Sequence, residues 1–215
     1  MRVSEIFFSL QGEGVNIGHP AVFLRLAGCN LRCLWCDSKY TWDEGQELSC
    51  DEILERVRAC PCQRLVITGG EPLLQDEDIA ALLARLPDWK VEIETNGTVL
   101  PSQAIVARAQ LNVSPKLASS RHTLNVRFKP HILGTLARKD ASFKFVVDSA
   151  DDLAEVEMMV RTCGIPAENV ILMPQGVDEA TIVAKARELV EHCKERGYRL
   201  LPRFHVTLFG NQRGV

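Results

Sequence analysis

Short runs of apolar and β-branched residues alternate along the chain with longer segments in which apolar residues recur at helical spacing. The short runs predict strands at 21–26, 65–68, 91–94, 111–114, 143–147, 170–173 and 198–204. The longer segments predict helices at 50–59, 76–86, 102–109, 150–163 and 178–196. The pattern over 115–138 favours neither element, and we expect mostly loop there.

Local signals mark the ends of several of these helices. Ser102 follows Pro101, the acidic pair Asp178-Glu179 suits the positive end of the last helix, and Gly197 stands where that helix should stop. Strands that alternate with helices are joined by crossovers and lie parallel, so the fold class is α/β. The 215 residues fall short of the ~250 typical of eight strand–helix units. We therefore expect one domain over 1–215, an abbreviated TIM-type barrel of parallel strands.

The carboxyl ends of the predicted strands carry polar or glycine-rich motifs. They are Cys29, Gly69-Gly70-Glu71, Thr95-Asn96-Gly97, Ser114-Pro115-Lys116 and Pro174-Gln175-Gly176. Ligands of parallel α/β sheets bind at these strand ends. We expect the motifs to form one shared site.

Charge, hydrophobic segments and cysteine content limit the classes of protein to which the chain can belong. The net charge of -3 provides no basic face for nucleic acid, and no segment approaches the ~20 apolar residues of a membrane span. The amino terminus has no signal-peptide pattern, so we expect a cytoplasmic protein. Eight cysteines in a reducing compartment then indicate metal ligation or catalysis for any tight group of them.

One such group is Cys29, Cys33 and Cys36, spaced by three and then two intervening residues. Thiolates ligate iron–sulfur clusters and zinc. A structural zinc ion would need a fourth ligand, and no other Cys or His lies close by in sequence. A cluster held by three cysteines leaves one iron open to a small molecule. The interleaved Gly28, Asn30 and Arg32 make three packed core thiols a poor alternative.

This loop, after a first strand, resembles the signature of the radical S-adenosylmethionine (SAM) superfamily, and 68–72 is similar to its second motif. The resemblance implies a radical SAM core with a four-iron four-sulfur cluster whose open iron binds SAM. One-electron cleavage of SAM would then yield a 5′-deoxyadenosyl radical. The cofactor contacts implied by the resemblance are Trp35, Cys36, Asp37, Gly69, Gly70, Glu71, Ser114, Pro115, Lys116, Met173, Pro174, Gln175 and Gly176.

Further stretches narrow the resemblance to the 7-carboxy-7-deazaguanine synthase family of queuosine biosynthesis. They are 10–14, 23–36, Cys36-Asp37-Ser38, 68–72, 92–97, 114–116 and the ending Gly210-Asn211-Gln212-Arg213-Gly214-Val215. The family contracts the ring of 6-carboxy-5,6,7,8-tetrahydropterin, a radical reaction that loses ammonia and regenerates SAM. A homodimer, and flavodoxin or ferredoxin as the reductant, would follow from the same resemblance, with no direct nucleic-acid or membrane partner.

The resemblance also assigns the substrate site. Leu10, Gln11, Gly12 and Glu13 would line the pterin, Thr68 and Glu94 would meet its ring, and Val215 would close the pocket. Arg25 would pair with the substrate carboxylate, and Arg25 and Glu94 are the expected catalytic residues. Ser38 would bind a Mg²⁺ ion at a position where many relatives have threonine.

Other interpretations remain open at this point. A glycyl-radical activase of the same superfamily would need an exposed groove, and the motif at 11–13 and the Arg-Gly-Val ending argue against it. A non-catalytic iron–sulfur electron carrier would ligate its cluster fully, and a zinc-binding domain would be colourless. The Cys60-Pro61-Cys62 pair is expected to be structural, with a redox role as the alternative.

Overall fold

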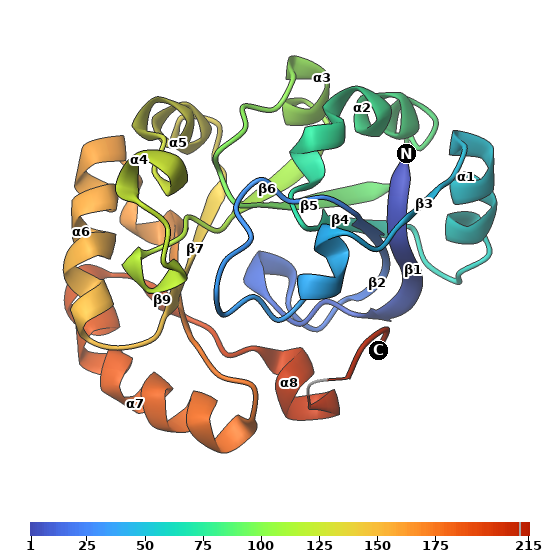
Figure 1. Ribbon diagram of the computed structural model, residues 1–215. Coiled ribbons are helices and arrows are strands. Elements are labelled where there is room, and N and C mark those ends of the chain that lie inside the picture. The colour runs from blue at the N-terminus through green and yellow to red at the C-terminus, as the bar shows by residue number, and fades with distance from the viewer. Residues whose placement is uncertain (211) are drawn as a thin grey trace.

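The computed structural model describes residues 1–210 and 212–215, and a curved sheet of nine strands in the order β3-β1-β2-β4-β5-β6-β7-β8-β9 forms its centre (Figure 1). The strands are β1 (Arg2–Leu10), β2 (Pro20–Leu26), β3 (Gln46–Glu47), β4 (Arg64–Gly69), β5 (Lys90–Thr95), β6 (Ala109–Val113), β7 (Ser142–Val147), β8 (Val170–Pro174) and β9 (Arg199–Leu200). From β2 to β9 all neighbours pair in parallel, whereas β1 is antiparallel to β2 and β3. The prediction of an abbreviated parallel barrel is confirmed.

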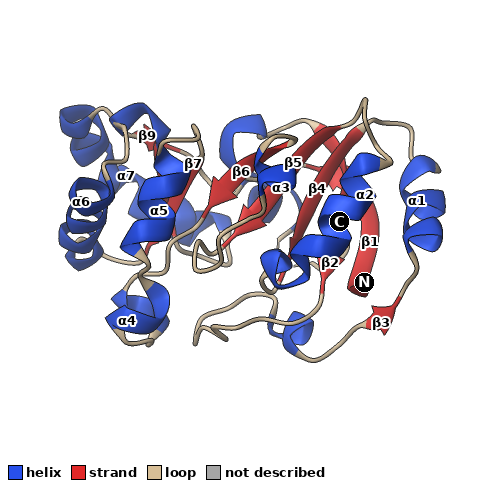
Figure 2. Cartoon of the chain, turned by 90° about the horizontal axis from the view of Figure 1, so that it is seen from above, coloured by secondary structure: helices blue, strands red, loops and turns tan. Residues whose placement is uncertain are grey.

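The helices are α1 (Cys50–Arg58), α2 (Asp76–Ala84), α3 (Gln103–Val106), α4 (Leu124–Arg127), α5 (Pro130–Ala137), α6 (Asp151–Cys163), α7 (Glu179–Arg196) and α8 (Phe204–Phe209). Most of them cover the outside of this curve (Figure 2), whereas α8 lies on its open side. Asp178 caps α7 by accepting a hydrogen bond from the Thr181 N–H, and Gly197 ends that helix in the left-handed conformation, as the sequence predicted. Among the described helices, none is long and apolar enough to cross a membrane.

The parallel strands separate apolar from polar side chains between the two faces of the sheet. Along β5, the alternate residues Val91 and Ile93 pack into the main core under the helices. Glu92 and Glu94 therefore point to the concave face, and Asn112 on β6 and Lys144 on β7 follow the same alternation and bond to Glu94 there. The interior of the partial barrel is thus lined with charged and amide groups.

Three sequence predictions need correction. Strand β1 was not predicted, because a register shift between Val3 and Glu5 interrupts the alternation that would have identified it. The last predicted strand, 198–204, is a strand only at β9, and Phe204 instead begins α8. The segment 115–138 holds α4 and α5 rather than mostly loop. Asn211, part of the C-terminal motif, lies outside the described residues.

Candidate active site

The cysteine loop leaves the carboxyl end of β2 and is fixed by backbone hydrogen bonds. The Gly28 N–H donates to the Thr41 carbonyl at 2.7 Å, and the Cys36 N–H donates to the Cys33 carbonyl at 3.2 Å. Cys33 is buried, and Cys29 and Cys36 are half-buried. Burial raises the pKa of the Cys33 thiol, and the nearby Cys29 and Cys36 raise it further. The loop therefore holds one buried and two half-buried thiols on a backbone fixed by hydrogen bonds.

The glycines of the second motif bring the end of β4 against this loop. The Gly70 N–H donates to the Leu26 carbonyl and the Glu71 N–H to the Gly28 carbonyl. A Cβ atom on Gly69 would lie 2.1 Å from the Leu26 carbonyl oxygen, and one on Gly70 would lie 2.1 Å from that of Gly28. Only glycine permits this approach, so the motif sets the position of the cysteine loop.

Glu71, a predicted cofactor contact, is fully buried. Its carboxylate accepts hydrogen bonds from the Leu73 N–H at 3.0 Å, the Thr95 hydroxyl at 2.9 Å and the Asn96 N–H at 2.7 Å. Asn96 in turn donates to the Asn30 side chain at 3.0 Å. The Glu71 side chain thus joins the ends of β4 and β5 to the cysteine loop.

The motif after β6 lies on the other side of the same loop. The Ser114 N–H donates to the Thr95 carbonyl at 2.7 Å, and the Ser114 hydroxyl accepts a hydrogen bond from the Lys116 ammonium at 2.9 Å. That ammonium lies 5.7 Å from the centre of the Trp35 ring. Its charge also acts on the Cys33 and Cys36 thiols, partly opposing the effect of burial on their pKa values. Pro115 is buried between these two residues.

An ion-pair group occupies the concave face. The Lys144 ammonium lies 2.5 Å from a Glu94 carboxylate oxygen and 2.9 Å from one of Glu13, and its side chain is only 3% exposed. Burial raises the pKa of Glu94, and the neighbouring charge of Glu13 adds to this despite Lys144. The pKa of Glu13 is instead held well below its usual value, because Lys144 and Arg203 together outweigh its burial.

Amide side chains extend this group towards β4. Gln11 is buried, and its amide donates to Glu92 at 3.3 Å and to Glu94 at 3.4 Å. Asn112 donates to the same two carboxylates at 3.1 and 2.9 Å. The Arg64 guanidinium pairs with Glu92 at 2.8 Å. The structure thus brings the predicted Gln11, Glu13 and Glu94 together through residues that the sequence interpretation missed.

A second polar group contains Arg25. Its guanidinium donates to Glu5 at 2.6 Å and lies 5.5 Å from the centre of the Phe7 ring. The Tyr40 hydroxyl donates to the same carboxylate at 2.8 Å; burial and this hydrogen bond raise the pKa of Tyr40 to about 12, so the hydroxyl keeps its proton. Arg213 adds a second guanidinium at 3.1 Å from Glu5. Arg213 also pairs with Glu44 at 3.2 Å, so the two guanidinium groups are matched by two carboxylates. Thr68 is paired in register with Arg25 on the adjacent strand.

The C-terminal segment closes the open side of the barrel, where α8 lies between β1 and the last strands (Figure 1). Arg203 bonds to Glu13 at 3.2 Å, to the Gly176 carbonyl at 2.9 Å and to Asp37. The Phe204 N–H donates to the Gly12 carbonyl at 2.9 Å. A Cβ atom on Gly12 would lie 2.4 Å from His205, so glycine is needed for α8 to dock. Leu10 and Val215, two further predicted substrate contacts, are half-buried.

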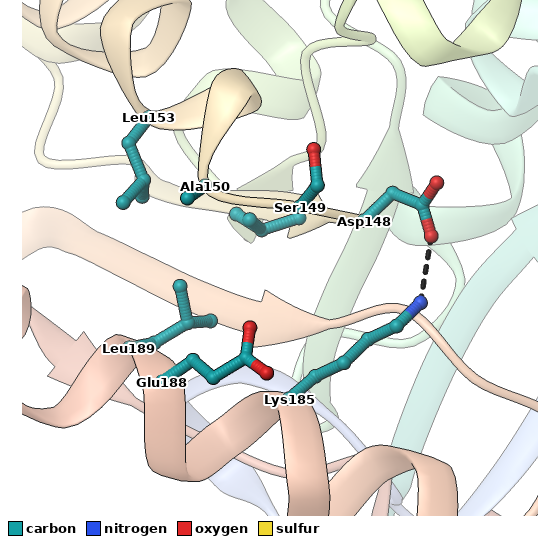
Figure 3. Close-up of a pocket in the computed structure, with 8 residues that line it drawn as sticks. Asp148, Ser149, Ala150, Leu153, Lys185, Glu188 and Leu189 are labelled. Carbon is teal, nitrogen blue, oxygen red and sulfur yellow. Dashed lines mark hydrogen bonds and ion pairs between the residues drawn. The ribbon is translucent and has the colours of Figure 1, made fainter.

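The motif after β8 is the most peripheral part of the site. Met173, Pro174 and Gly176 are buried, and the Gln175 N–H donates to the Val147 carbonyl at 2.8 Å. The Gln175 side chain accepts a hydrogen bond from Lys185, which also pairs with Asp148 at 2.6 Å beside a hollow between α6 and α7 (Figure 3). Lys185 thus connects this motif to the end of β7.

The donor set fits the cofactors that the sequence implies. Three free thiols share one short loop, and glycine backbone lies against that loop where no side chain would fit. Within residues 1–210 and 212–215, no three His, Cys, Asp or Glu side chains are arranged around a single metal ion. A cubane cluster makes a different demand, because each thiolate binds its own iron. The Ser38 hydroxyl donates to Asp37 at 2.9 Å and lies beside this loop.

The residues that the sequence interpretation missed have one common signal. Lys144, Glu92 and Asn112 each stand between two core residues of a buried strand, as in Phe143-Lys144-Phe145. A charged or amide residue at such a position needs a partner on the opposite face from the core. Glu5 and Arg203 carried no comparable signal, because their partners depend on the antiparallel β1 and on α8.

Comparison with known proteins gives a consistent result. Residues 24–189 match the Radical SAM superfamily. A 7-carboxy-7-deazaguanine synthase from Pyrobaculum aerophilum is 40% identical over 100% of this chain and 97% of its own, and one from Halobacterium salinarum is 39% identical over 98% and 91%. The crystal structure of QueE from Escherichia coli superposes with a TM-score of 0.74 at 26% identity and covers 95% of this chain and 94% of that one. Streptococcus suis SuiB bound to S-adenosylmethionine has a TM-score of 0.54 at 16% identity, over 81% of this chain and 44% of that one, and shows the fold alone.

Proposed function

Because this chain belongs to the radical SAM superfamily and, within it, to the 7-carboxy-7-deazaguanine synthase family, we infer that it converts 6-carboxy-5,6,7,8-tetrahydropterin to 7-carboxy-7-deazaguanine with loss of ammonia. The observation that carries this inference is the polar concave face next to the cysteine loop. A barrel interior lined by paired carboxylates and amides suits a flat heterocycle with both donors and acceptors on its edge. The enzyme is a lyase of queuosine biosynthesis.

The cofactors would sit where the strand ends meet. Cys29, Cys33 and Cys36 would hold the four-iron cluster, and the glycine backbone at 69–70 would face SAM. When bound, these two groups supply the radical that removes a hydrogen atom from the substrate. The fixed contacts among 28–30, 69–71 and 95–96 hold the loop in one geometry, which keeps the reacting atoms close.

The substrate would be oriented by its two ends. Glu13 and Glu94 present carboxylate oxygens that can accept hydrogen bonds from the amino group and ring N–H of a pterin, and Lys144 keeps both carboxylates in place. At the other end, the Arg25 guanidinium, which Glu5 holds in place, would pair with the substrate carboxylate. Gln11 would fix the ring plane from the inner side of the sheet.

Several finer assignments belong to the same proposal. Ser38 would supply one ligand to a Mg²⁺ ion whose other ligands are substrate oxygens and waters, a mode in which few protein groups are needed. We also propose a homodimer, a single functional domain over 1–215, a flavodoxin or ferredoxin as reductant, and a cytoplasmic location. All eight cysteines are free thiols, which supports a reducing compartment.

The test is direct. Anaerobically reconstituted protein is incubated with the carboxy-tetrahydropterin, SAM, Mg²⁺ and dithionite, and the products are analysed by mass spectrometry. We expect 7-carboxy-7-deazaguanine and one ammonia per turnover. Cleavage of SAM without this product, beside a competent control enzyme, would retain the superfamily chemistry and reject the substrate. Omission of Mg²⁺ in a parallel reaction tests the Ser38 assignment.

A further inference from the structure

The Glu94 carboxylate is surrounded on the concave face by side chains that donate hydrogen bonds to it. Its Oε1 atom accepts one from the Asn112 amide at 2.9 Å and one from the Gln11 amide at 3.4 Å, and its Oε2 atom lies 2.5 Å from the Lys144 ammonium. An ionised carboxylate offers about four lone pairs. The described side chains therefore use both lone pairs of Oε1 and one of Oε2, which leaves one acceptor position for a substrate N–H.

The orientation of both amides is fixed by further hydrogen bonds. The Ser142 hydroxyl, in register with Asn112 on the neighbouring strand β7, donates to the Asn112 Oδ1 atom at 2.7 Å. The N–H groups of Asn112 must then point at the two carboxylates of β5, and the reversed amide would place Oδ1 against both of them. The Gln11 amide is fixed similarly, because its Oε1 atom accepts a hydrogen bond from the Glu13 N–H at 3.2 Å. Asn112 and Ser142 are buried, so a turned amide would leave donors unpaired.

Glu92 closes this network on the side away from Lys144. Its Oε2 atom accepts hydrogen bonds from Gln11 at 3.3 Å and from Asn112 at 3.1 Å, and its Oε1 atom pairs with Arg64 at 2.8 Å. The two amides thus bridge the two carboxylates of β5, and each amide donates to both. The like charges of β5 are separated by amide donors, with one cation at each end of the network.

The amide donors also affect the charge state of Glu94. Burial raises the pKa of Glu94, Lys144 lowers it, Glu13 raises it, and the hydrogen bond from Asn112 lowers it. The charged and titratable groups around the two carboxylates of this network come from β4, β5, β7, the segment after β1 and the C-terminal segment, and they are Arg64, Glu92, Lys144, Glu13, Arg203 and His205. Without the Asn112 amide, the pKa of Glu94 would rise further and its carboxyl group would keep a proton up to a higher pH.

We propose that Asn112 is a positioning residue that keeps Glu94 a fixed, ionised hydrogen-bond acceptor and thereby selects a substrate with an N–H donor edge. Ser142 supports this role by orienting the Asn112 amide. The proposal deepens the proposed function and rests on it, because it requires that Glu94 meets the pterin ring. The amino group and ring N–H of a pterin form such an edge, whereas an analogue with a carbonyl in place of the amino group would face the carboxylate with an acceptor.

The test compares three variants of the reconstituted enzyme. Asn112→Leu removes both amide donors at similar volume, and Ser142→Ala removes only the hydroxyl that orients the amide. Asn169→Leu is the matched control, because the Asn169 amide also donates to a carboxylate, that of Asp140 at 3.1 Å, but lies before β8 at the opposite end of the strands.

Three measurements are made on each protein. Turnover of the carboxy-tetrahydropterin from about pH 5.5 to about pH 9 gives KM, kcat and the pH profile of kcat/KM. Formation of 5′-deoxyadenosine without pterin reports on the cluster and the SAM site. Calorimetry compares binding of the oxidised carboxypterin with binding of the analogue that has a carbonyl in place of the amino group.

For Asn112→Leu we expect the KM for the pterin to rise about tenfold, with a smaller change in kcat and unchanged SAM cleavage without pterin. The acid limb of kcat/KM should move to higher pH, because Glu94 must lose a proton that it now holds more tightly. The preference for carboxypterin over the carbonyl analogue should fall about tenfold. Ser142→Ala should shift the same quantities in the same direction by about threefold, and Asn169→Leu should match the parent protein.

An unchanged KM together with an unmoved acid limb in Asn112→Leu would overturn the proposal. Equal losses of pterin turnover and SAM cleavage would also overturn it, since they would show a general structural role. If Asn112→Leu does not fold, Ser142→Ala decides in its place by the same criteria. No product from the parent protein would instead reject the proposed function, and the calorimetric comparison of the two ligands would still support or overturn the role of Asn112.

Discussion

Lys144 is a buried cation between the carboxylates of Glu13 and Glu94, so its removal should cost more than any exposed substitution. At an effective dielectric constant of about 20, each contact of Lys144 with Glu13 and Glu94 amounts to roughly 6 kcal/mol of Coulomb attraction. Desolvation of the buried ions offsets much of this. Breaking such a pair by removing one partner costs about 3–5 kcal/mol, which we expect for Lys144→Met.

The unfolding free energy lost in Lys144→Met should also increase with pH. The pKa of Glu94 is already raised by burial and by Glu13, and removal of Lys144 raises it further. At pH values between the usual carboxylate pKa and this raised pKa, Glu94 is protonated in the folded variant and ionised in the unfolded chain. In that window, stability falls as the pH rises. The difference in unfolding free energy between the parent and Lys144→Met should therefore be larger at about pH 8 than at about pH 5.5.

Anaerobic urea denaturation of both proteins at the two pH values measures this difference. Lys139→Met is the matched control, because Lys139 is exposed and should change stability by less than about 0.5 kcal/mol. A loss below about 1 kcal/mol for Lys144→Met, or the same loss at both pH values, would refute the reasoning.

Three further predictions follow from the site. Gly70→Ala places a Cβ atom 2.1 Å from the Gly28 carbonyl oxygen and should displace the cysteine loop. Iron and sulfide analysis after reconstitution should then find well under four irons per chain, and full iron loading would contradict this prediction. Cys33→Ala should abolish the formation of 5′-deoxyadenosine, and retained cleavage in a chromatographic assay would disprove the ligand assignment. Arg203→Met breaks ion pairs with Glu13 and Asp37 and should destabilise the protein by about 3 kcal/mol in thermal unfolding. Product formation should fall more than SAM cleavage. Equal losses of both activities would argue against a role of Arg203 at the substrate end.

The parallel part of the fold was predictable because its information is local. Each buried strand is a short apolar run, and helix ends such as Asp178 and Gly197 carry signals within a few residues. Strand β1 has no such local signature, since its bulge breaks the alternation and its partner is 20 residues away at Arg25. Whether the end of 198–204 forms strand or helix depends on the contact between Phe204 and Gly12, and the spacing of residues in the sequence does not reveal this contact.

The residues of the candidate site also fall into two groups, those that local sequence identifies and those that it does not. The cysteines and glycines are recognisable from their spacing, because backbone close approach and thiolate ligation each need one residue type at one position. The partners of the charged groups are not recognisable in this way. Arg25 is predicted to pair with the substrate carboxylate, and in the structure its guanidinium pairs with Glu5, which also accepts a hydrogen bond from the Tyr40 hydroxyl. Glu71 is predicted to contact the cofactor, and in the structure its carboxylate also joins the ends of β4 and β5.

The closure of the barrel and the charge balance of its interior depend on each other. The N-terminal half contributes acids to the concave face and its rim, namely Glu5, Glu13 and Asp37, and the last thirteen residues contribute Arg203 and Arg213 to the same three carboxylates. Without the C-terminal segment, Asp37 would have no described cationic partner and Glu13 only Lys144. The side chains of Glu5 and Glu13 are only 15% and 22% exposed, and carboxylates with so little solvent access are costly without partners, so electrostatics favour the closed arrangement. The segment that covers the open side of the barrel is thus held by the charges that it neutralises, which explains why a short helix of six residues suffices there.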